Sequence, residues 1–170
     1  MKVALVSLNQ SWEDKEANRL KVRNCFQTIA FRNMDLVIFP EMTLTGFTMN
    51  VKEHAEEAEN SATIRFFTDC ACQYGVYIGF GMILKAGIKA ANHFIIVSPE
   101  GEMCADYIKI HPFSYAGEDR FYEKGKHLTS LEIQGVPIGL SICYDLRFPE
   151  IFQALSRTDK LILNIANWPE

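Results

Sequence analysis

The sequence has no long hydrophobic run and no block of basic residues. Its longest apolar stretches, such as Leu36 to Phe39 and Leu161 to Ile165, are far shorter than the ~20 residues needed to cross a bilayer. The formal net charge is −4, without the basic cluster that a nucleic acid or an anionic membrane surface would attract. We therefore expect no nucleic-acid or membrane partner, and predict a small molecule or a second copy of the chain as the partner.

Signals of export are also lacking. The N-terminal run MKVALVSLNQ alternates in polarity and leads into a polar loop without a small-residue cleavage site, so we interpret it as a first strand. The 5 cysteines are odd in number and have no framework spacing, which fits a reducing compartment better than a disulfide scaffold. The sequence predicts a cytoplasmic protein with at least one free thiol.

The composition indicates one globular domain with a substantial core. The 170 residues are 48% hydrophobic and 22% charged, which is ordinary for a folded protein. No internal repeat, low-complexity segment or linker divides the chain, so we expect a single domain over residues 1–170. The buried strand expected at Leu161 to Asn164 is followed almost at once by Trp168-Pro169-Glu170, and we expect the chain to be truncated there.

Hydrophobic periodicity predicts an α/β sheet protein with helices packed on the faces of the sheet. Turn signals at Lys85-Ala86-Gly87 and Pro99-Glu100-Gly101 separate the central strands, which we expect to be antiparallel neighbours. Gly75 stands where a helix C-cap is expected, and Thr48 to Glu53 is expected to be a loop. The predicted helices are Asp14 to Arg32, Ala62 to Tyr74 and Pro149 to Arg157. The predicted strands are Val3 to Leu8, Leu36 to Phe39, Val76 to Leu84, Ala91 to Val97, Met103 to Ile108, Leu131 to Ile133, Val136 to Ile142 and Lys160 to Ile165.

Three short polar segments interrupt the apolar runs, and each follows an expected strand. They are Phe39-Pro40-Glu41, Tyr107-Ile108-Lys109 and Ser141-Ile142-Cys143-Tyr144-Asp145. A carboxylate, an amine and a thiol can together form an activated cysteine nucleophile, and rigid strands can present such side chains to one pocket. We expect all three segments at the same edge of one sheet, in an enzyme that cleaves amides.

Cys143 carries the most chemical information. A thiol on a tight strand-to-helix turn can act as a nucleophile, with the following backbone N–H groups free to hold an oxyanion. The alternative is a buried structural cysteine, a common fate of free cysteines, but the polar residues directly after Cys143 favour the nucleophile. We interpret the remaining cysteines as structural filler, and Cys70-Ala71-Cys72 lacks the second ligand pair of a zinc site. Those remaining cysteines are Cys25, Cys70, Cys72 and Cys104.

Glu41 and Lys109 are the expected partners of this thiol. A cysteine with its reference pKa of ~8.5 is mostly protonated at neutral pH, so it needs a base or a cation nearby. Partial burial would raise the proton affinity of Glu41 toward that of a useful base, and a desolvated Lys109 could stabilise an oxyanion. Taken singly, a glutamate such as Glu41 is more often a solvated loop residue or a helix cap, and a strand-end lysine such as Lys109 is usually just solvated. Only the set of three favours catalysis.

The motifs resemble those of the nitrilase, or carbon–nitrogen hydrolase, superfamily, and they occur in the right order along the whole chain. Within it, the sequence is most similar to the branch of small amidases that includes omega-amidase, which removes ammonia from the terminal amide of 2-oxo acid amides. The motifs that carry the resemblance are Phe39-Pro40-Glu41, Thr45-Gly46-Phe47, Tyr107-Ile108-Lys109-Ile110-His111, Cys143-Tyr144-Asp145-Leu146-Arg147-Phe148-Pro149-Glu150 and Ala166-Asn167-Trp168-Pro169.

The resemblance implies a fold and a set of roles. The fold is an αββα sandwich, with homodimerisation making a four-layer assembly, and this chain corresponds to roughly the N-terminal two-thirds of it. Glu41 would be the general base, Lys109 would hold the oxyanion together with the Tyr144 backbone N–H, and Cys143 would form a thioester. A second glutamate touches the lysine in this family. Glu118 is the better match for it, and Glu123 is the competing candidate.

The substrate-contacting residues are predicted less directly. Arg147 can pair bidentately with a substrate carboxylate, or form an ordinary salt bridge with Asp145, Glu150 or another carboxylate. Aromatic residues near the motifs can line the pocket, although aromatics more often fill cores. These aromatic candidates are Phe47, Phe113, Tyr115 and Trp168. The expected thioester mechanism requires no metal and no organic cofactor.

Other classes of function stay open at this point. A nitrilase-fold protein can bind partners without catalysis, although intact Glu41, Lys109 and Cys143 argue against that. A redox or metal module built on Cys70 and Cys72 would need further ligands. Nitrilases, N-carbamoylases and acyl-transferring enzymes share the same triad, and pocket shape rather than the catalytic residues separates them.

Overall fold

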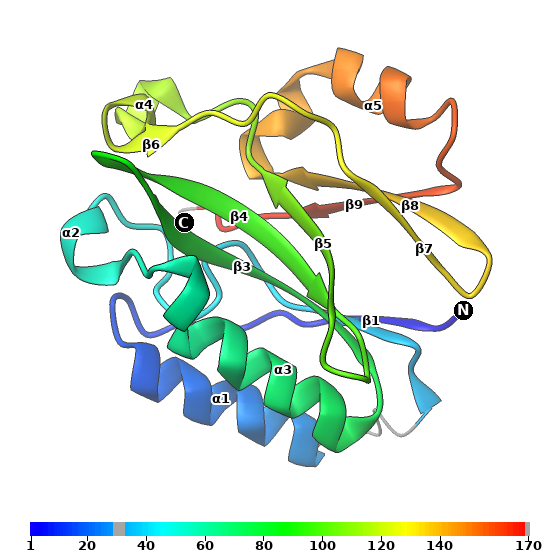
Figure 1. Ribbon diagram of the computed structural model, residues 1–170. Helices are drawn as coiled ribbons and strands as arrows, with labels where there is room; N and C mark the ends of the chain where they lie inside the picture. The colour runs from blue at the N-terminus through cyan, green and yellow to red at the C-terminus, as the bar shows by residue number, and fades with distance from the viewer. Residues whose placement is uncertain (29–32, 169–170) are drawn as a thin grey trace.

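The computed structural model describes residues 1–28 and 33–168, and these form four layers in the order helix, sheet, sheet, helix (Figure 1). One apolar core lies between the helices α1 and α3 and the first sheet, and a second core lies between the two sheets. The predicted αββα sandwich is thus confirmed. Because all four layers lie within one chain, the expectation that dimerisation creates the four layers is wrong. Homodimerisation itself stays a prediction.

The first sheet combines parallel and antiparallel pairing. Its strands follow the order β1-β2-β3-β4-β5, with β6 beside β4. The pairs β1–β2 and β2–β3 are parallel, whereas β3–β4 and β4–β5 are antiparallel, as the turn signals predict. Its members are β1 (Val3–Leu5), β2 (Leu36–Ile38), β3 (Tyr77–Ala86), β4 (Lys89–Val97), β5 (Met103–Ile108) and β6 (Tyr122–Glu123).

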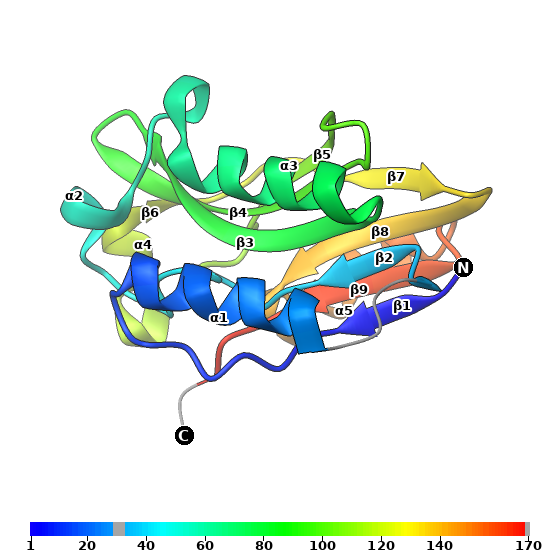
Figure 2. The ribbon, with the colours of Figure 1, turned by 90° about the horizontal axis from the view of Figure 1, so that it is seen from below.

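Two helices cover the outer face of this sheet, α1 (Lys15–Thr28) and α3 (Ala62–Tyr74), and Figure 2 shows them side by side over it. The hydroxyl of Ser61 accepts the N–H of Ile64 at the start of α3, and Gly75 ends α3 with a φ of 62°, which a residue without a Cβ adopts readily. The predicted C-cap is confirmed. The last four residues of the first predicted helix, 29–32, lie outside the described residues.

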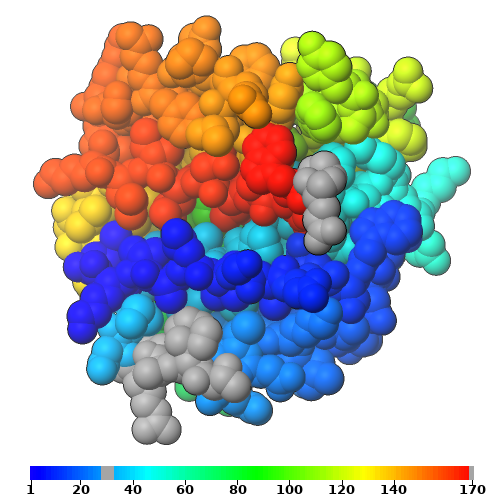
Figure 3. Space-filling model, turned by 180° about the vertical axis from the view of Figure 1, so that it is seen from behind, coloured from blue at the N-terminus to red at the C-terminus, as the bar shows by residue number. Residues whose placement is uncertain are grey.

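The second sheet consists of β7 (Ser130–Ile133), β8 (Val136–Ile142) and β9 (Leu161–Ile165), with β8 in the middle. Helix α5 (Pro149–Leu155) forms the fourth layer. Since β1 and β9 each end their sheet, one flank of the sandwich carries two edge strands, and Figure 3 shows the N-terminal segment (dark blue) running along the C-terminal segment (red). Within the described residues, no helix has the length and apolarity to span a membrane.

Short elements are the main departure from the sequence-based expectation. The expected loop over Thr48 to Glu53 contains most of helix α2 (Val51–His54). The segment before β7 contains α4 (Glu118–Phe121) and β6, neither of which the pattern predicts. Elements this short carry less than two turns of periodicity, so no hydrophobic pattern marks them. Further short 3-10 helices are η2 (Ala58–Asn60), η3 (Ser114–Ala116) and η4 (Cys143–Arg147).

Gly81 on β3 allows the chain after β2 to approach the sheet closely. A Cβ at Gly81 would lie 2.4 Å from the backbone nitrogen of Met42 and 2.6 Å from Cα of Glu41. The backbone N–H of Thr43 donates to the Gly81 carbonyl at 2.8 Å, so this contact fixes the segment that carries Glu41. Any side chain at position 81 would push that segment away.

We therefore predict that Gly81→Ala lowers the free energy of unfolding by about 3 kcal/mol, because overpacking here meets backbone rather than flexible side chains. Gly87→Ala is the control, since Gly87 has a φ of +63° and a Cβ added there would meet no atom within 4 Å; that change should cost only the left-handed strain of about 1 kcal/mol. Urea denaturation of both variants measures the difference. Equal losses would contradict the close-approach explanation.

Candidate active site

The three predicted segments meet at one end of the sandwich, but they come from two sheets. Glu41 follows β2 and Lys109 follows β5 in the first sheet, whereas Cys143 follows β8 in the second. The expectation that all three lie at the edge of one sheet is therefore wrong. The apolar side chains of both inner faces pack together, and this packing brings the strand ends of the two sheets to a shared site.

Glu41 is held inside the protein by the turn that follows β2. Met42 has a φ of 45°, and the hydroxyl of Thr43 donates to the Pro40 carbonyl at 2.7 Å. These features bend the chain back against Gly81, and the Glu41 side chain is fully buried. The alternative of a solvated loop carboxylate at this position is thereby excluded.

Lys109 is also buried, and its ammonium group lies between two carboxylates. Its Nζ atom is 3.0 Å from Glu41 Oε1 and 3.1 and 2.9 Å from the two carboxylate oxygens of Glu118. Glu118, in α4, is fully buried as well. Glu123, the competing candidate, instead pairs with Lys89 at 3.4 Å in a half-exposed position. The structure thus places Glu118, and not Glu123, against the lysine.

Asn92 on β4 joins the two glutamates, and sequence analysis did not single it out. Its Nδ2 atom donates to Glu41 Oε1 at 2.7 Å and to Glu118 Oε1 at 3.3 Å. Both N–H bonds of the amide are used in this way, and Oδ1 is buried without a hydrogen-bond partner among the described residues. Since both neighbours are acceptors, the amide cannot be turned over to satisfy Oδ1 without losing both bonds.

Cys143 stands on a strained turn directly after β8. Its φ of 47° is in the left-handed region, which is uncommon for a residue with a side chain. The 3-10 helix η4 begins at Cys143 itself, so the thiol lies where the strand turns into a helical segment, as predicted. Cys143 is 6% exposed, and Glu41 and Lys109 lie close enough to act electrostatically on its thiol. Glu41, Lys109 and Cys143 therefore form one contiguous cluster.

Burial and charge shift the proton affinities within this cluster. Burial, and then the negative charge of Glu41, raise the pKa of the Cys143 thiol to about 12, against the opposing effect of Lys109. Burial also raises the pKa of Glu41 above its ordinary value of 4.5. Burial by itself would lower the pKa of Lys109, but the carboxylates of Glu41 and Glu118 outweigh it and raise that pKa. The resting site thus holds a thiol, a carboxylate with increased proton affinity, and a permanent cation.

The two oxygens of Glu41 have different surroundings. Oε1 accepts hydrogen bonds from Lys109 and from Asn92, whereas Oε2 accepts the neutral backbone N–H of Asn167 at 3.0 Å. Two side-chain donors, one of them cationic, make Oε1 the poorer proton acceptor. The site therefore offers Oε2 as the oxygen that can take a proton. Asn167 belongs to one of the family motifs, but sequence analysis assigned it no role.

The predicted substrate-contacting residues include two contacting pairs, Phe113 with Tyr144 and Arg147 with Trp168. The rings of Phe113 and Tyr144 lie 4.9 Å apart. Arg147 is exposed and lies over the ring of Trp168, with its Cζ atom 5.8 Å from the ring centre. Asp145, a suggested partner of Arg147, instead accepts hydrogen bonds from Tyr107 and His111. No salt bridge of Arg147 occurs among residues 1–28 and 33–168.

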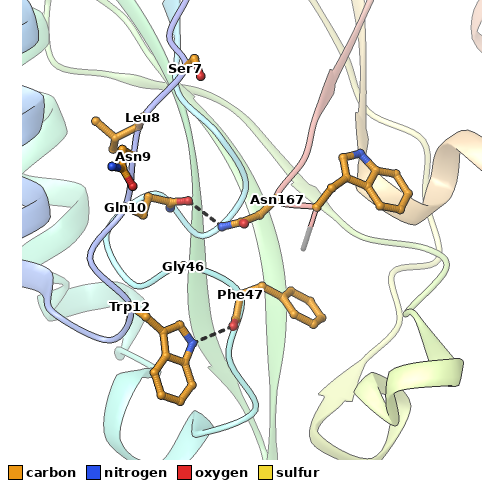
Figure 4. Close-up of a pocket in the computed structure, with 9 residues that line it drawn as sticks. Ser7, Leu8, Asn9, Gln10, Trp12, Gly46, Phe47 and Asn167 are labelled. Atoms are coloured by element: carbon orange, nitrogen blue, oxygen red, sulfur yellow. Dashed lines mark hydrogen bonds between the residues drawn. The ribbon is translucent and has the colours of Figure 1, made fainter. Parts of the chain in front are cut away.

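The structure contains a cavity of about 710 Å³ (Figure 4), and two of its lining residues also contact the Glu41–Lys109–Cys143 cluster. Phe47 and Asn167 connect the two: the Phe47 ring centre lies 5.6 Å from Lys109 Nζ, and the Asn167 side chain donates to Gln10 Oε1 at 2.6 Å on the cavity side. Of the predicted substrate-contacting residues, Phe47 and Trp168 line the cavity. The lining residues are Ser7, Leu8, Asn9, Gln10, Trp12, Gly46, Phe47, Asn167 and Trp168.

The remaining cysteines have varied environments. Cys70 is buried, as expected of structural filler, and burial raises the pKa of its thiol to about 11. Cys72 and Cys104 are exposed, so the filler interpretation is wrong for these two. Because one thiol of the Cys70-Ala71-Cys72 pair is buried and the other exposed, the two do not share a site. The part of the chain that the structure describes holds no group of three or more His, Cys, Asp or Glu residues arranged for a metal ion.

Comparisons with known proteins agree with this fold. The family model described as carbon-nitrogen hydrolase matches residues 2–168, and the chain therefore belongs to that family. The chain is 32% identical over 169 residues to the omega-amidase YafV of Yersinia enterocolitica, and 28% identical over 158 residues to the 2-oxoglutaramate amidase of Bacillus subtilis. These matches cover 99% and 91% of this chain, but only 64% and 61% of the relatives' own lengths.

Solved structures give the same result. A CN-hydrolase superfamily protein of Xanthomonas campestris, with an arsenic adduct in its active site, superposes with a TM-score of 0.88 at 28% identity, over 99% of this chain and 65% of the other. Nit3 of Saccharomyces cerevisiae shares the fold, with a TM-score of 0.85 at 24% identity over 98% of this chain and 64% of that one. The predicted family resemblance is confirmed.

The electrostatics of the cluster predict the outcome of Glu41→Gln. Removing the negative charge of Glu41 leaves the positive charge of Lys109 to act on the thiol, so the pKa of Cys143 should fall from about 12. Iodoacetamide labelling of Cys143, followed by mass spectrometry between about pH 8 and pH 10, should become faster by roughly 3-fold or more. The exposed Cys72 in the same protein is the internal control. Slower labelling of Cys143 at an unchanged Cys72 rate would contradict this electrostatic assignment.

Proposed function

We propose that the protein is an amidase that hydrolyses the terminal amide of a small carboxylate-bearing substrate, through a thioester on Cys143, and releases ammonia. The observation that carries the proposal is the buried Glu41–Lys109–Glu118 charge cluster, which acts electrostatically on a thiol that lies on a strained turn. The family membership and the omega-amidase relatives support the same class of reaction.

The first half-reaction forms the thioester. Glu41 takes the thiol proton on Oε2 while the sulfur attacks the amide carbon, and the carbonyl electron pair moves onto oxygen. Lys109 and the backbone N–H of Tyr144 hold this oxyanion, since the first N–H groups of a helical turn have no partner within the turn. The oxyanion then collapses, the C–N bond breaks, and the proton on Glu41 passes to the departing ammonia.

The second half-reaction releases the acid. Glu41, again a carboxylate, takes a proton from water as the water oxygen attacks the thioester carbon. Lys109 and the Tyr144 N–H hold the second oxyanion, which collapses with cleavage of the C–S bond, and the sulfur regains its proton from Glu41. Burial favours this cycle, because a carboxylate with a raised pKa is a stronger base than an exposed one.

Arg147 and the names of the relatives support the proposed substrate class. The guanidinium of Arg147 lies over Trp168 and is free to meet a substrate carboxylate bidentately. The relatives of Yersinia enterocolitica and Bacillus subtilis carry the names omega-amidase and 2-oxoglutaramate amidase. A 2-oxo acid amide such as 2-oxoglutaramate is therefore our proposed substrate, with Phe113, Tyr144 and Trp168 as the aromatic walls of its site.

Ammonia release tests the reaction and its nucleophile. The purified protein is offered 2-oxoglutaramate, 2-oxosuccinamate, glutamine, an N-carbamoyl amino acid and a simple nitrile. We expect release from the 2-oxo acid amides, and its abolition by Cys143→Ala, because the proposed thioester forms on that sulfur. Cys72→Ala, at an exposed position, should retain full activity.

Other outcomes separate the alternatives. Turnover that survives Cys143→Ala would remove the covalent mechanism. Preference for the N-carbamoyl compound or the nitrile would indicate an N-carbamoylase or a nitrilase with the same cluster. No turnover of any compound, with Cys143 still open to labelling, would favour a nitrilase-fold binding protein.

Arg147→Leu tests the carboxylate contact. Loss of a bidentate ion pair should raise KM for 2-oxoglutaramate by about 10- to 100-fold, with a smaller effect on kcat, because the contact lies away from the reacting carbon. Arg157→Leu is the matched control, since Arg157 is also exposed and lies just beyond α5. An unchanged KM in Arg147→Leu, or an equal rise in both variants, would exclude Arg147 as the carboxylate reader.

A further inference from the structure

Asp145 is a fully buried carboxylate that the reaction outlined above does not use. It lies two residues after Cys143, and both of its oxygens accept two hydrogen bonds. Oδ2 accepts the Tyr107 hydroxyl at 2.7 Å and the Ile142 backbone N–H at 3.0 Å. Oδ1 accepts the backbone N–H of His111 at 2.9 Å and lies 3.0 Å from His111 Nδ1.

These four contacts involve residues of both sheets that lie close in sequence to Lys109 and Cys143. Tyr107 and His111 stand two residues before and two residues after Lys109, at the end of β5 in the first sheet. Ile142 is the last residue of β8 in the second sheet and directly precedes Cys143. The Asp145 side chain therefore ties a residue on each side of Lys109 to Ile142, the residue directly before Cys143.

The partners of Asp145 are themselves fixed. Tyr107 is fully buried, and burial together with the charge of Asp145 raises its pKa, so its hydroxyl stays protonated and donates. The His111 ring stacks on Phe148 with ring centres 3.6 Å apart and an angle of 6° between the planes. An ionised carboxylate can only accept hydrogen bonds, so each of these four contacts must be a donor to Asp145. Together the four donors fix the orientation of the Asp145 side chain.

We infer that Asp145 is a positioning residue that sets the distance between the Lys109 ammonium and the Cys143 thiol across the two sheets. The contact of its Oδ2 with the Ile142 N–H closes the turn in which Cys143 adopts its left-handed conformation. The contacts to Tyr107 and His111 hold the lysine-bearing segment against that turn. The expected effect on kcat rests on the proposed thioester chemistry. The expected effect on the distance between Lys109 and Cys143 does not.

The test compares three variants. Asp145→Asn replaces an all-acceptor group by one whose NH₂ faces a donor, and Tyr107→Phe removes one link to the first sheet while keeping the ring. Ser141→Ala is the matched control. Ser141 is buried near the end of β8, and its hydroxyl donates to the Leu163 carbonyl at 3.2 Å, so this bond stays within the second sheet and does not link the two sheets. Each variant is first checked for folding, and Tyr107→Phe serves if Asp145→Asn does not fold.

For 2-oxoglutaramate, we expect kcat to fall about 100-fold in Asp145→Asn and about 10-fold in Tyr107→Phe, with KM changed less than about 3-fold, because small displacements of reacting groups act on the transition state. Ser141→Ala should keep kcat within about 2-fold, and the double variant of Tyr107 and Asp145 should be no slower than Asp145→Asn. A kcat that is unchanged, or that falls equally in Ser141→Ala, would overturn the inference.

Labelling of Cys143 gives a readout that needs no substrate. The charged groups that act most strongly on the thiol are Glu41 and Lys109, and Glu118 lies on the far side of the Lys109 ammonium. Of these groups, only Lys109 lowers the pKa of the thiol and so stabilises the thiolate. A lysine held farther away should slow iodoacetamide labelling about 3-fold in Tyr107→Phe, which removes a link to Asp145 without changing a charge, but not in Ser141→Ala. If the unmodified protein releases no ammonia from any compound, the proposed function fails, and this labelling comparison alone decides the positioning role. Equal labelling rates would then refute it.

Discussion

The buried ammonium of Lys109 is the constraint around which the rest of the structure is arranged. An isolated charge in the interior costs several kcal/mol, and breaking a buried ion pair typically costs about 3–5 kcal/mol. Two buried carboxylates compensate the charge of Lys109, and the amide of Asn92 donates a hydrogen bond to each of them. Each member depends on the others, because removing one leaves an uncompensated buried charge. The strand ends that carry them are consequently held in one relative position.

The same arrangement separates the tasks of the Glu41 oxygens. Oε1 faces the cation and the amide of Asn92, whereas Oε2 faces the backbone N–H of Asn167. A carboxylate surrounded evenly by donors would be a weak base. Here burial raises the proton affinity of Glu41, and the uneven distribution of donors directs the proton to one oxygen. Stability and reactivity thus come from one set of contacts, and the unpartnered Oδ1 of Asn92 is a cost of holding both carboxylates.

Sequence patterns predict the long elements and the members of the Glu41–Lys109–Cys143 cluster, but not how they are assembled. The helix Ala62 to Tyr74 has its predicted bounds, because its periodicity is sustained and a cap ends it. The hydrophobic pattern by itself did not give the division into two sheets, since it indicates the face of a strand and not its neighbours; only the family resemblance implied it. The missed roles likewise depend on contacts distant in sequence: Asn92 stands in an apolar strand, 51 positions from Glu41, and Asp145 acts as a link only because Tyr107 of the other sheet reaches it.

Two different kinds of force meet at the site, and their combination explains its geometry. Apolar packing between the sheets brings the strand ends together, but it is non-directional and tolerates small displacements of one layer against the other. Hydrogen bonds and ion pairs are directional, and here they cross from sheet to sheet: Asn167 reaches Glu41, and Tyr107 reaches Asp145. The core therefore determines that the strand ends meet, whereas the polar contacts determine the separations at which the acid, the amine and the thiol face one another.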